Sequence, residues 1–258
     1  MSKILFVTWN GGGNVPPALG IATALARRGH RVGFLGHAQQ EEQIRARDFS
    51  FQPFRHARPW SSTAPWSGLR GSVKLVSLFA DRGPGVDLAE VVTREPTDLV
   101  VVDQLMWGAL SAAESLGVRH ATLVHSLYGP QRDTWSRGPG ALLARLQGRR
   151  PVQLWLSSER VIVATLRDLD PAGPEELPEN VCYTGPVWEG CPVPATTTVK
   201  EPIGGLLPGA RAGRSVRGRN VRTPATAPLA RHRNVHSPAN VPRAPDSAAS
   251  WRRRGAFV

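Results

Sequence analysis

Short apolar segments alternate with longer amphipathic ones along the first two hundred residues. Residues 3–9 are almost entirely apolar and are followed by Asn10 and three glycines, the pattern of a buried parallel strand that ends in a tight turn. Apolar residues then recur at helical spacing between a Pro-Pro pair and Gly29. The chain therefore opens with a predicted strand and a predicted helix.

The same alternation continues to about residue 185. It predicts helices at 39–47, 73–79, 86–94, 106–116 and 142–146, and further strands at 31–35, 49–54, 98–102, 119–124, 160–164 and 181–184. Residues 55–70 are rich in Pro, Trp and Gly and predict an irregular loop. Alternating strands and helices predict an α/β fold, a Rossmann-like parallel sheet flanked by helices.

Polar residues stand at the ends of three predicted strands. Asn14 closes the loop after the first strand, Asp103 ends a later one, and His125 follows the next. Ligands of open parallel sheets bind outside the carboxyl ends of the strands, so we expect a cleft there. Each residue also has a purely structural alternative: Asn14 as a helix N-cap, Asp103 as a cap for the following helix, and His125 as an internally hydrogen-bonded histidine.

Length and cysteine content exclude several classes of protein. A chain of 258 residues can bury a core without cross-links, and its 2 Cys are too few for a disulfide scaffold or a four-cysteine zinc site. No stretch is apolar enough for a membrane span or a signal peptide. We expect a cytoplasmic protein without a bound metal.

The glycine turn after the first strand allows a weaker reading as a nicotinamide-dependent reductase. Residues 11–13 supply the first two glycines of a dinucleotide fingerprint, but Pro16 stands at the third position. The second strand also ends without the carboxylate that would hold a ribose. A Gly-x-Ser-x-Gly elbow is absent from the sequence, which argues against a serine hydrolase of that type.

The positive charge is concentrated in the last part of the chain. The net charge is +12, and residues 201–258 hold 11 Lys+Arg against 2 Asp+Glu. Residues 208–258 lack any apolar period, which predicts a disordered basic tail. Three origins are open: a shifted reading frame of GC-rich DNA, which we favour, a native disordered tail, or an arm that binds nucleic acid. Nucleic acid is not an expected partner, because the tail lacks a series of stacking aromatics.

Four motifs together resemble the N-terminal half of a GT-B glycosyltransferase of the UDP-glycosyltransferase and macrolide glycosyltransferase kind. They are GNVPPAL at 13–19, LARRGHRV at 25–32, TDLVVVD at 97–103 and YTGPV at 183–187. The resemblance spans roughly residues 1–195. It implies an acceptor-binding domain at 1–190 and an interdomain-type linker at 191–207.

The resemblance also implies a reaction. Such enzymes transfer a hexose from a UDP- or dTDP-sugar to a hydroxyl of a small hydrophobic acceptor, with inversion and without a metal or other cofactor. A His held by an Asp deprotonates the acceptor. Asp103 matches that Asp, but Asn14 stands at the position of the base, and an amide does not accept a proton at neutral pH. Three explanations are open: Asp103 or His125 serves as the base, the acceptor needs little deprotonation, or the protein is inactive. Asn14 can still position the acceptor by hydrogen bonding.

The expected acceptor site combines the glycine turn with flat aromatic faces. Its predicted residues are Gly12, Gly13, His56, Trp60, Trp66, Trp107 and Tyr128. The structural alternative is that the indoles only cover the edge of the sheet.

No His-Gly-Gly diphosphate-binding segment follows residue 200. We therefore expect this chain to lack the donor-binding domain and to be inactive alone, with a nucleotide sugar as partner only where that domain is supplied. The alternative function is a non-catalytic module that binds a small molecule or assists a glycosyltransferase in trans.

Overall fold

The structure is a computed structural model that describes residues 1–60 and 68–187. The predictions for Trp66, for the linker at 191–207 and for the tail at 208–258 therefore lie outside the described residues. Among the helices of the described segments, none is both long and apolar enough to cross a membrane.

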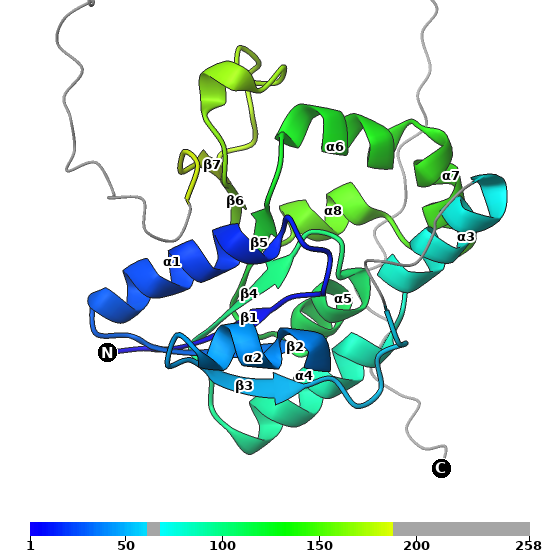
Figure 1. Ribbon diagram of the computed structural model, residues 1–258. Helices are drawn as coiled ribbons and strands as arrows, with labels where there is room; N and C mark the ends of the chain where they lie inside the picture. The colour runs from blue at the N-terminus through cyan, green and yellow to red at the C-terminus, as the bar shows by residue number, and fades with distance from the viewer. Residues whose placement is uncertain (61–67, 188–258) are drawn as a thin grey trace, which may run out of the picture. The chain divides into compact units, whose positions relative to one another are not determined.

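Seven parallel strands form one sheet in the order β3-β2-β1-β4-β5-β6-β7 (Figure 1). Register is continuous along each pair; in the central pair, for example, Ile4 lies opposite Leu99 and Val7 opposite Val102. The strands are β1 (Lys3–Val7), β2 (Arg31–Gly36), β3 (Ser50–Pro53), β4 (Leu99–Asp103), β5 (His120–Val124), β6 (Arg160–Val163) and β7 (Val181–Tyr183).

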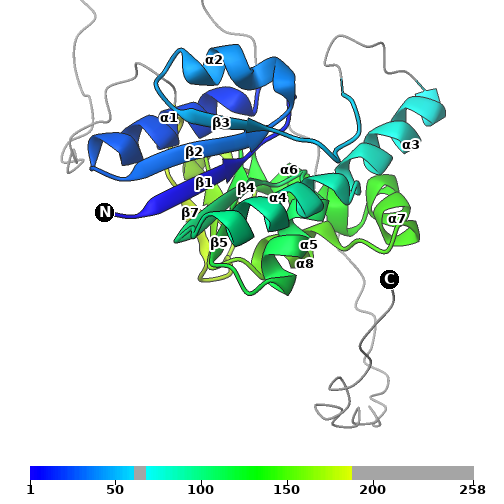
Figure 2. The ribbon, with the colours of Figure 1, turned by 90° about the horizontal axis from the view of Figure 1, so that it is seen from below.

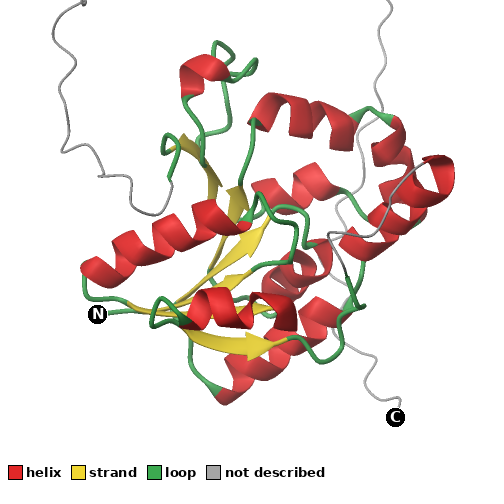
Figure 3. Ribbon diagram, viewed as in Figure 1, coloured by secondary structure: helices red, strands yellow, loops and turns green. Residues whose placement is uncertain are grey.

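Helices cover both faces of the sheet, as Figures 2 and 3 show. α1 (Val15–Arg27) and α2 (Glu41–Arg45) pack on one face. The remaining α-helices pack on the other face or continue from it: α3 (Gly68–Phe79), α4 (Gly83–Arg94), α5 (Trp107–Ser115), α6 (Tyr128–Ser136), α7 (Pro139–Leu146) and α8 (Pro151–Leu156). Two single 3-10 turns, η1 (Ala38–Gln40) and η2 (Arg167–Leu169), complete the described elements.

The central strands are apolar throughout because both of their faces are buried. Ile4 and Phe6 of β1 belong to the core beneath α1 and α2, whereas Leu5 and Val7 belong to the core beneath α4 and α5. Successive side chains of a strand point to opposite faces. A sheet covered on both sides therefore requires a continuous apolar run rather than alternation.

Helices α4 and α5 meet at two glycines. A Cβ at Gly85 would lie 2.5 Å from the carbonyl oxygen of Gly108, and a Cβ at Gly108 would lie 1.9 Å from the carbonyl oxygen of Asp81. Since these neighbours are backbone atoms, they cannot rotate away. The close approach of the two helices depends on the absence of both side chains.

We expect Gly108→Ala to lower the free energy of unfolding by about 2–3 kcal/mol, the usual cost of overpacking a core. Gly13→Ala is the matched control, because a Cβ at Gly13 meets nothing within 4 Å. Urea unfolding followed by circular dichroism measures both. Equal stability of the two variants would mean that α4 and α5 separate at little cost.

The predicted α/β fold is confirmed, and all seven strands lie where the sequence places them, within a few residues at each end. Two corrections concern helices. α6 and α8 were not predicted, and α3 begins at Gly68, inside the segment predicted to be a loop. These three helices are held by contacts with other parts of the chain that the local pattern does not show.

Candidate functional site

The point where the strand order reverses lies between β1 and β4. From β1 the chain runs outward through β2 and β3, and it then returns to place β4 on the other side of β1. Loops that follow such neighbouring strands diverge and leave room for a ligand. The loop with Asn14 follows β1, Asp103 ends β4, and His125 follows β5, so the structure brings the three predicted catalytic residues to one edge.

Asn14 joins these loops through its side-chain amide. It is almost fully buried, and its Nδ2 lies 3.0 Å from Asp103 Oδ2, 2.9 Å from the carbonyl oxygen of Trp9 and 3.1 Å from Thr8 Oγ1. Asn14 occupies the N-cap position of α1, but its side chain makes no capping hydrogen bond there. The residue therefore holds the β1 loop to Asp103 instead of capping its own helix.

Asp103 lies between Asn14 and His125. Its Oδ1 accepts a hydrogen bond of 2.9 Å from the Leu105 amide, and its Oδ2 lies 3.2 Å from His125 Nδ1 as well as accepting from Asn14. Burial lowers the pKa of His125, but the Asp103 carboxylate more than offsets it, so the pKa stands above its ordinary value. The His125 side chain keeps 16% of its surface exposed although Nδ1 is buried.

Buried polar atoms without a hydrogen-bond partner gather at this same edge. Apart from His125 Nδ1, which lies beside Asp103, six such side-chain atoms belong to residues that follow β1, β4 or β5: Trp9 Nε1, Asn14 Oδ1, Gln104 Nε2 and Oε1, Trp107 Nε1 and Ser126 Oγ. Proteins rarely leave buried polar groups unpaired outside functional sites. The concentration indicates that this edge is built to meet polar groups of a ligand.

The loop after β3 borders the site on one side. His37 Nδ1 accepts from the Asn10 amide at 3.3 Å, and its Nε2 faces the carbonyl oxygen of Arg58 at 3.3 Å. Burial lowers the pKa of His37, which favours the neutral ring that this pair of contacts requires. Trp60 donates to the carbonyl oxygen of Asn10 at 2.7 Å and packs edge-on against Trp9. These contacts connect the loops that follow β1, β2 and β3, which together form one rim of the site.

The predicted acceptor-binding aromatics are mostly inside the protein. Trp107 and Tyr128 have at most 1% of their surface exposed, and Trp60 has 7%. Trp107 packs against Phe79 and Trp135. Among the hollows of the described residues, the one beside this rim, lined by Trp9 and His37, has a volume of only about 10 Å³.

Gly12 and Gly13 lie exposed in the turn, where Gly12 has a φ of 85° that favours glycine.

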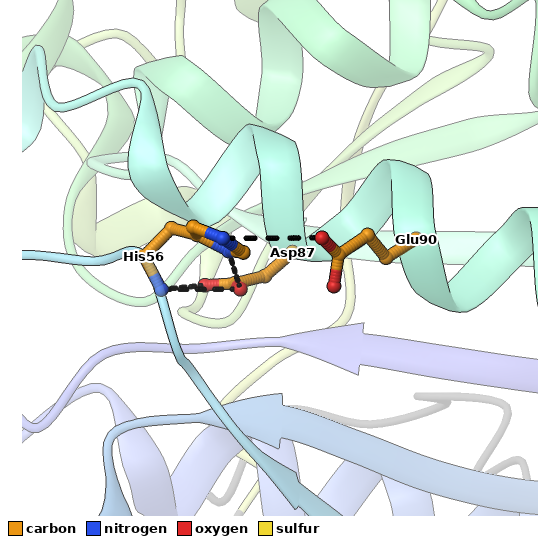
Figure 4. A group of neighbouring side chains, drawn as sticks. All are labelled: His56, Asp87 and Glu90. Atoms are coloured by element: carbon orange, nitrogen blue, oxygen red, sulfur yellow. Dashed lines mark hydrogen bonds and ion pairs between the residues drawn. The ribbon is translucent and has the colours of Figure 1, made fainter.

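His56, in the loop after β3, belongs to a separate cluster with Asp87 and Glu90 of α4 (Figure 4). Its Nδ1 lies 2.7 Å from Asp87 Oδ1, its Nε2 lies 3.9 Å from Glu90 Oε1, and the three groups' ligand atoms lie within 4.8 Å of one another. The buried Asp87 already accepts from the backbone amides of Arg55 and His56. It therefore serves to anchor the loop after β3, and the hydrogen bond from His56 to Asp87 holds the pKa of His56 above its ordinary value.

Gln104 and Ser126 were not singled out from the sequence although they flank the site. Each stands directly after a residue that was, Asp103 or His125, and each has buried side-chain atoms without a partner. Their position just beyond a strand end was the available signal. His37, which follows β2, could have been found by the same rule.

Asn14→Asp tests the role of the buried amide. The substitution keeps the shape of the side chain but replaces the donating amide nitrogen with a carboxylate oxygen, which then faces the oxygens of Asp103 and Trp9. We therefore expect a loss of about 2–3 kcal/mol of unfolding free energy at pH 8. Repulsion raises the pKa of the new carboxyl in the folded state, so the loss should shrink as the pH falls. Chemical unfolding at pH 5 and 8 measures this. A loss that does not depend on pH would contradict it.

Comparison with known proteins points to one class of enzyme. No family model matches the sequence. A curated relative, 4'-demethylrebeccamycin synthase of Lentzea aerocolonigenes, is 27% identical over 186 residues, covering 64% of this chain and 43% of that protein. The chain thus spans less than half the length of this relative.

Solved structures show the same fold. The glycotransferase of kitacinnamycin is 19% identical, with a TM-score of 0.55 over 72% of this chain and 51% of its own. CalG4, the calicheamicin glycosyltransferase, is 20% identical, with a TM-score of 0.55 over 72% and 53%. Arabidopsis thaliana UGT89C1 complexed with UDP-L-rhamnose is 14% identical, with a TM-score of 0.56 over 72% and 52%. The chain therefore resembles glycosyltransferases, and it shares the Rossmann-like fold of about half of each of these structures.

Proposed function

We propose that this chain supplies the acceptor-binding half of a glycosyltransferase that moves a hexose from a nucleotide sugar to a hydroxyl of a small hydrophobic acceptor, with inversion. The observation that carries the proposal is the placement of Asp103 between Asn14 and His125 at the point where the strand order reverses. The unpaired buried polar atoms around these residues support it. The relative's name, a synthase of 4'-demethylrebeccamycin, supports a natural-product acceptor.

In this proposal His125 is the general base. Its Nδ1 faces Asp103, which leaves Nε2 to take a proton, the same logic by which a buried carboxylate orients a catalytic histidine. The acceptor's hydroxyl proton passes to Nε2, the oxygen bonds to the anomeric carbon, and the nucleoside diphosphate leaves with the electron pair of the bond that breaks. Asn14 fixes the Asp103 carboxylate and brings the β1 loop to the acceptor.

The nucleotide sugar belongs to the other half of the enzyme in this proposal, because the described residues correspond to one half of the matched structures. The Trp60 loop forms one wall of the acceptor site. Trp107 and Tyr128 support that wall from behind, since they are buried.

Transfer assays with the donor half of the relative test the proposal. The chain is mixed with the C-terminal half of 4'-demethylrebeccamycin synthase, the aglycone of 4'-demethylrebeccamycin, and UDP-glucose or dTDP-glucose, and products are followed by mass spectrometry. We expect a hexosylated product, and a loss of about 10²–10⁴-fold in rate for His125→Gln, as for removal of a general base. Lys74→Gln, on α3, is the control.

A second candidate is a non-catalytic module that binds the same class of small molecule. The presence of Asn14 where the family carries its base favours it. Acceptor binding, measured by quenching of tryptophan fluorescence, without any transfer would select this module. Transfer that is unaffected by His125→Gln would assign the base to another residue, and neither binding nor transfer would reject both candidates.

A further inference from the structure

A second hollow lies away from the Asp103 edge, among α5, α7 and α8. Its volume is about 510 Å³, within the range of small-molecule sites, and a neighbouring hollow of about 360 Å³ adjoins it. Both are lined by Arg145, Arg149, Arg150 and Gln153. We call the two together the arginine hollow.

The connection between α7 and α8 gathers these arginines. α7 ends at Leu146, Gly148 takes a positive φ of 69°, and the Arg149 amide donates back to the carbonyl oxygen of Ala144 at 2.8 Å. The turn presents Arg149 and Arg150 in succession before Pro151 starts α8. Arg145 lies in the last turn of α7.

The positive charge in the arginine hollow is not neutralised within the described residues. No carboxylate of residues 1–60 or 68–187 lies within ion-pair distance of Arg145, Arg149 or Arg150. Glu114 is the only acidic side chain among the residues that line the hollow. Elsewhere in the described chain arginines do pair closely: Arg119 lies 2.8 Å from Glu159.

Arg149 is held partly away from water beside another cation. It is half-buried and donates to Ser111 Oγ at 2.7 Å. Burial, together with the charge of Arg82, lowers the pKa of Arg149. Placing a guanidinium in such surroundings is unfavourable until an anion joins it, because desolvation and like charge both oppose the charged form.

We propose that the arginine hollow binds the phosphate or diphosphate group of a soluble small molecule. Guanidinium groups recognise phosphate oxygens in pairs through their planar array of N–H donors, and three of them converge here with Ser111 and Gln153 as neutral donors. The proposal is independent of the proposed transferase function, since it uses none of Asn14, Asp103 and His125.

Titration calorimetry of the 258-residue chain with sodium pyrophosphate tests the proposal. Arg149→Gln/Arg150→Gln is compared with Arg27→Gln/Arg28→Gln at the exposed end of α1. The two variants remove the same charge, so any background binding by arginines elsewhere in the chain is equal in both. We expect pyrophosphate affinity to fall about tenfold or more in the first variant only, because charge-assisted hydrogen bonds are lost.

Two further measurements cover the case in which the double variant does not fold and the case in which the ligand is a lipid headgroup. Arg150→Gln alone, which changes one exposed side chain, should weaken binding even if the double variant does not fold. Vesicles of phosphatidylglycerol distinguish a lipid headgroup from a soluble phosphate. Equal weakening in the two double variants, no binding of pyrophosphate by the native chain, or binding of vesicles alone would each overturn the proposal.

Discussion

Asp103→Asn will move the pKa of His125 from above to below its ordinary value near 6.5. Two influences oppose each other at this ring: burial lowers the pKa, and the Asp103 carboxylate at 3.2 Å raises it more. The substitution removes the carboxylate's charge but leaves the burial. The remaining influence disfavours the charged ring, so the direction of the shift should reverse.

Histidine Cε1–Hε1 resonances followed over pH measure this reversal. Asp87→Asn is the matched control, because it should lower the pKa of His56, whose largest influence is its hydrogen bond to Asp87, and leave His125 unchanged. A His125 pKa that does not respond to Asp103→Asn would mean that the two side chains do not interact in solution.

The same pair gives the native protein a defined pH dependence. Because the pKa of folded His125 is raised, its contribution to stability is fully present below the unfolded value and is lost as the pH rises through the folded value. In Asp103→Asn the folded pKa is lowered, so the sign reverses and this histidine's contribution improves with rising pH. The difference in unfolding free energy between the native protein and Asp103→Asn should therefore shrink as the pH rises from 5.5 to 8.5, since the other titrating groups contribute to both proteins.

Asp170→Ala should have the largest effect on stability, about 4–5 kcal/mol of unfolding free energy. Asp170 is 2% exposed and accepts hydrogen bonds from the backbone amides of Tyr128, Gly129 and Ala172. Tyr128 and Gly129 begin α6, whose N-cap Leu127 offers no side-chain acceptor. Removing the carboxylate leaves several buried donors unpaired at the positive end of a helix.

Urea unfolding compares Asp170→Ala with Asp168→Ala, an exposed carboxylate two residues earlier. The control should lie within about 0.5 kcal/mol of the native protein, as surface substitutions usually do. Asp170→Asn should fall between the two, because it keeps one acceptor oxygen. Equal stability of the Asp168 and Asp170 variants would show that α6 does not depend on this carboxylate.

The dependence of α6 on Asp170 explains why the sequence did not predict this helix. Residues 128–136 are largely polar, and their N-terminal cap comes from a carboxylate more than forty residues later in the chain. By contrast, β1 and β4 were predicted correctly, because a strand that is buried on both faces has apolar residues at nearly every position. Local patterns report burial, whereas a cap from a distant residue leaves no local pattern.

The candidate site was only partly predictable for a related reason. Strand ends identified Asn14, Asp103 and His125, and the parallel sheet brings them together. The pattern could not reveal that the Asn14 amide faces Asp103 instead of capping α1, since both are ordinary for an asparagine at this position. Trp107, taken as an exposed stacking face, is instead fully buried beneath the same edge.

Histidine resonances in the presence of an acceptor test the central claim most directly. The chain, with its seven histidines labelled, is titrated with the aglycone of 4'-demethylrebeccamycin at pH 8. The His125 signal is assigned by its absence from the spectrum of His125→Gln. If the acceptor binds at the Asp103 edge, this signal shifts with saturation while the His56 signal stays unchanged throughout. Saturable binding that shifts His56 and leaves His125 unaffected would place the acceptor elsewhere and contradict the account.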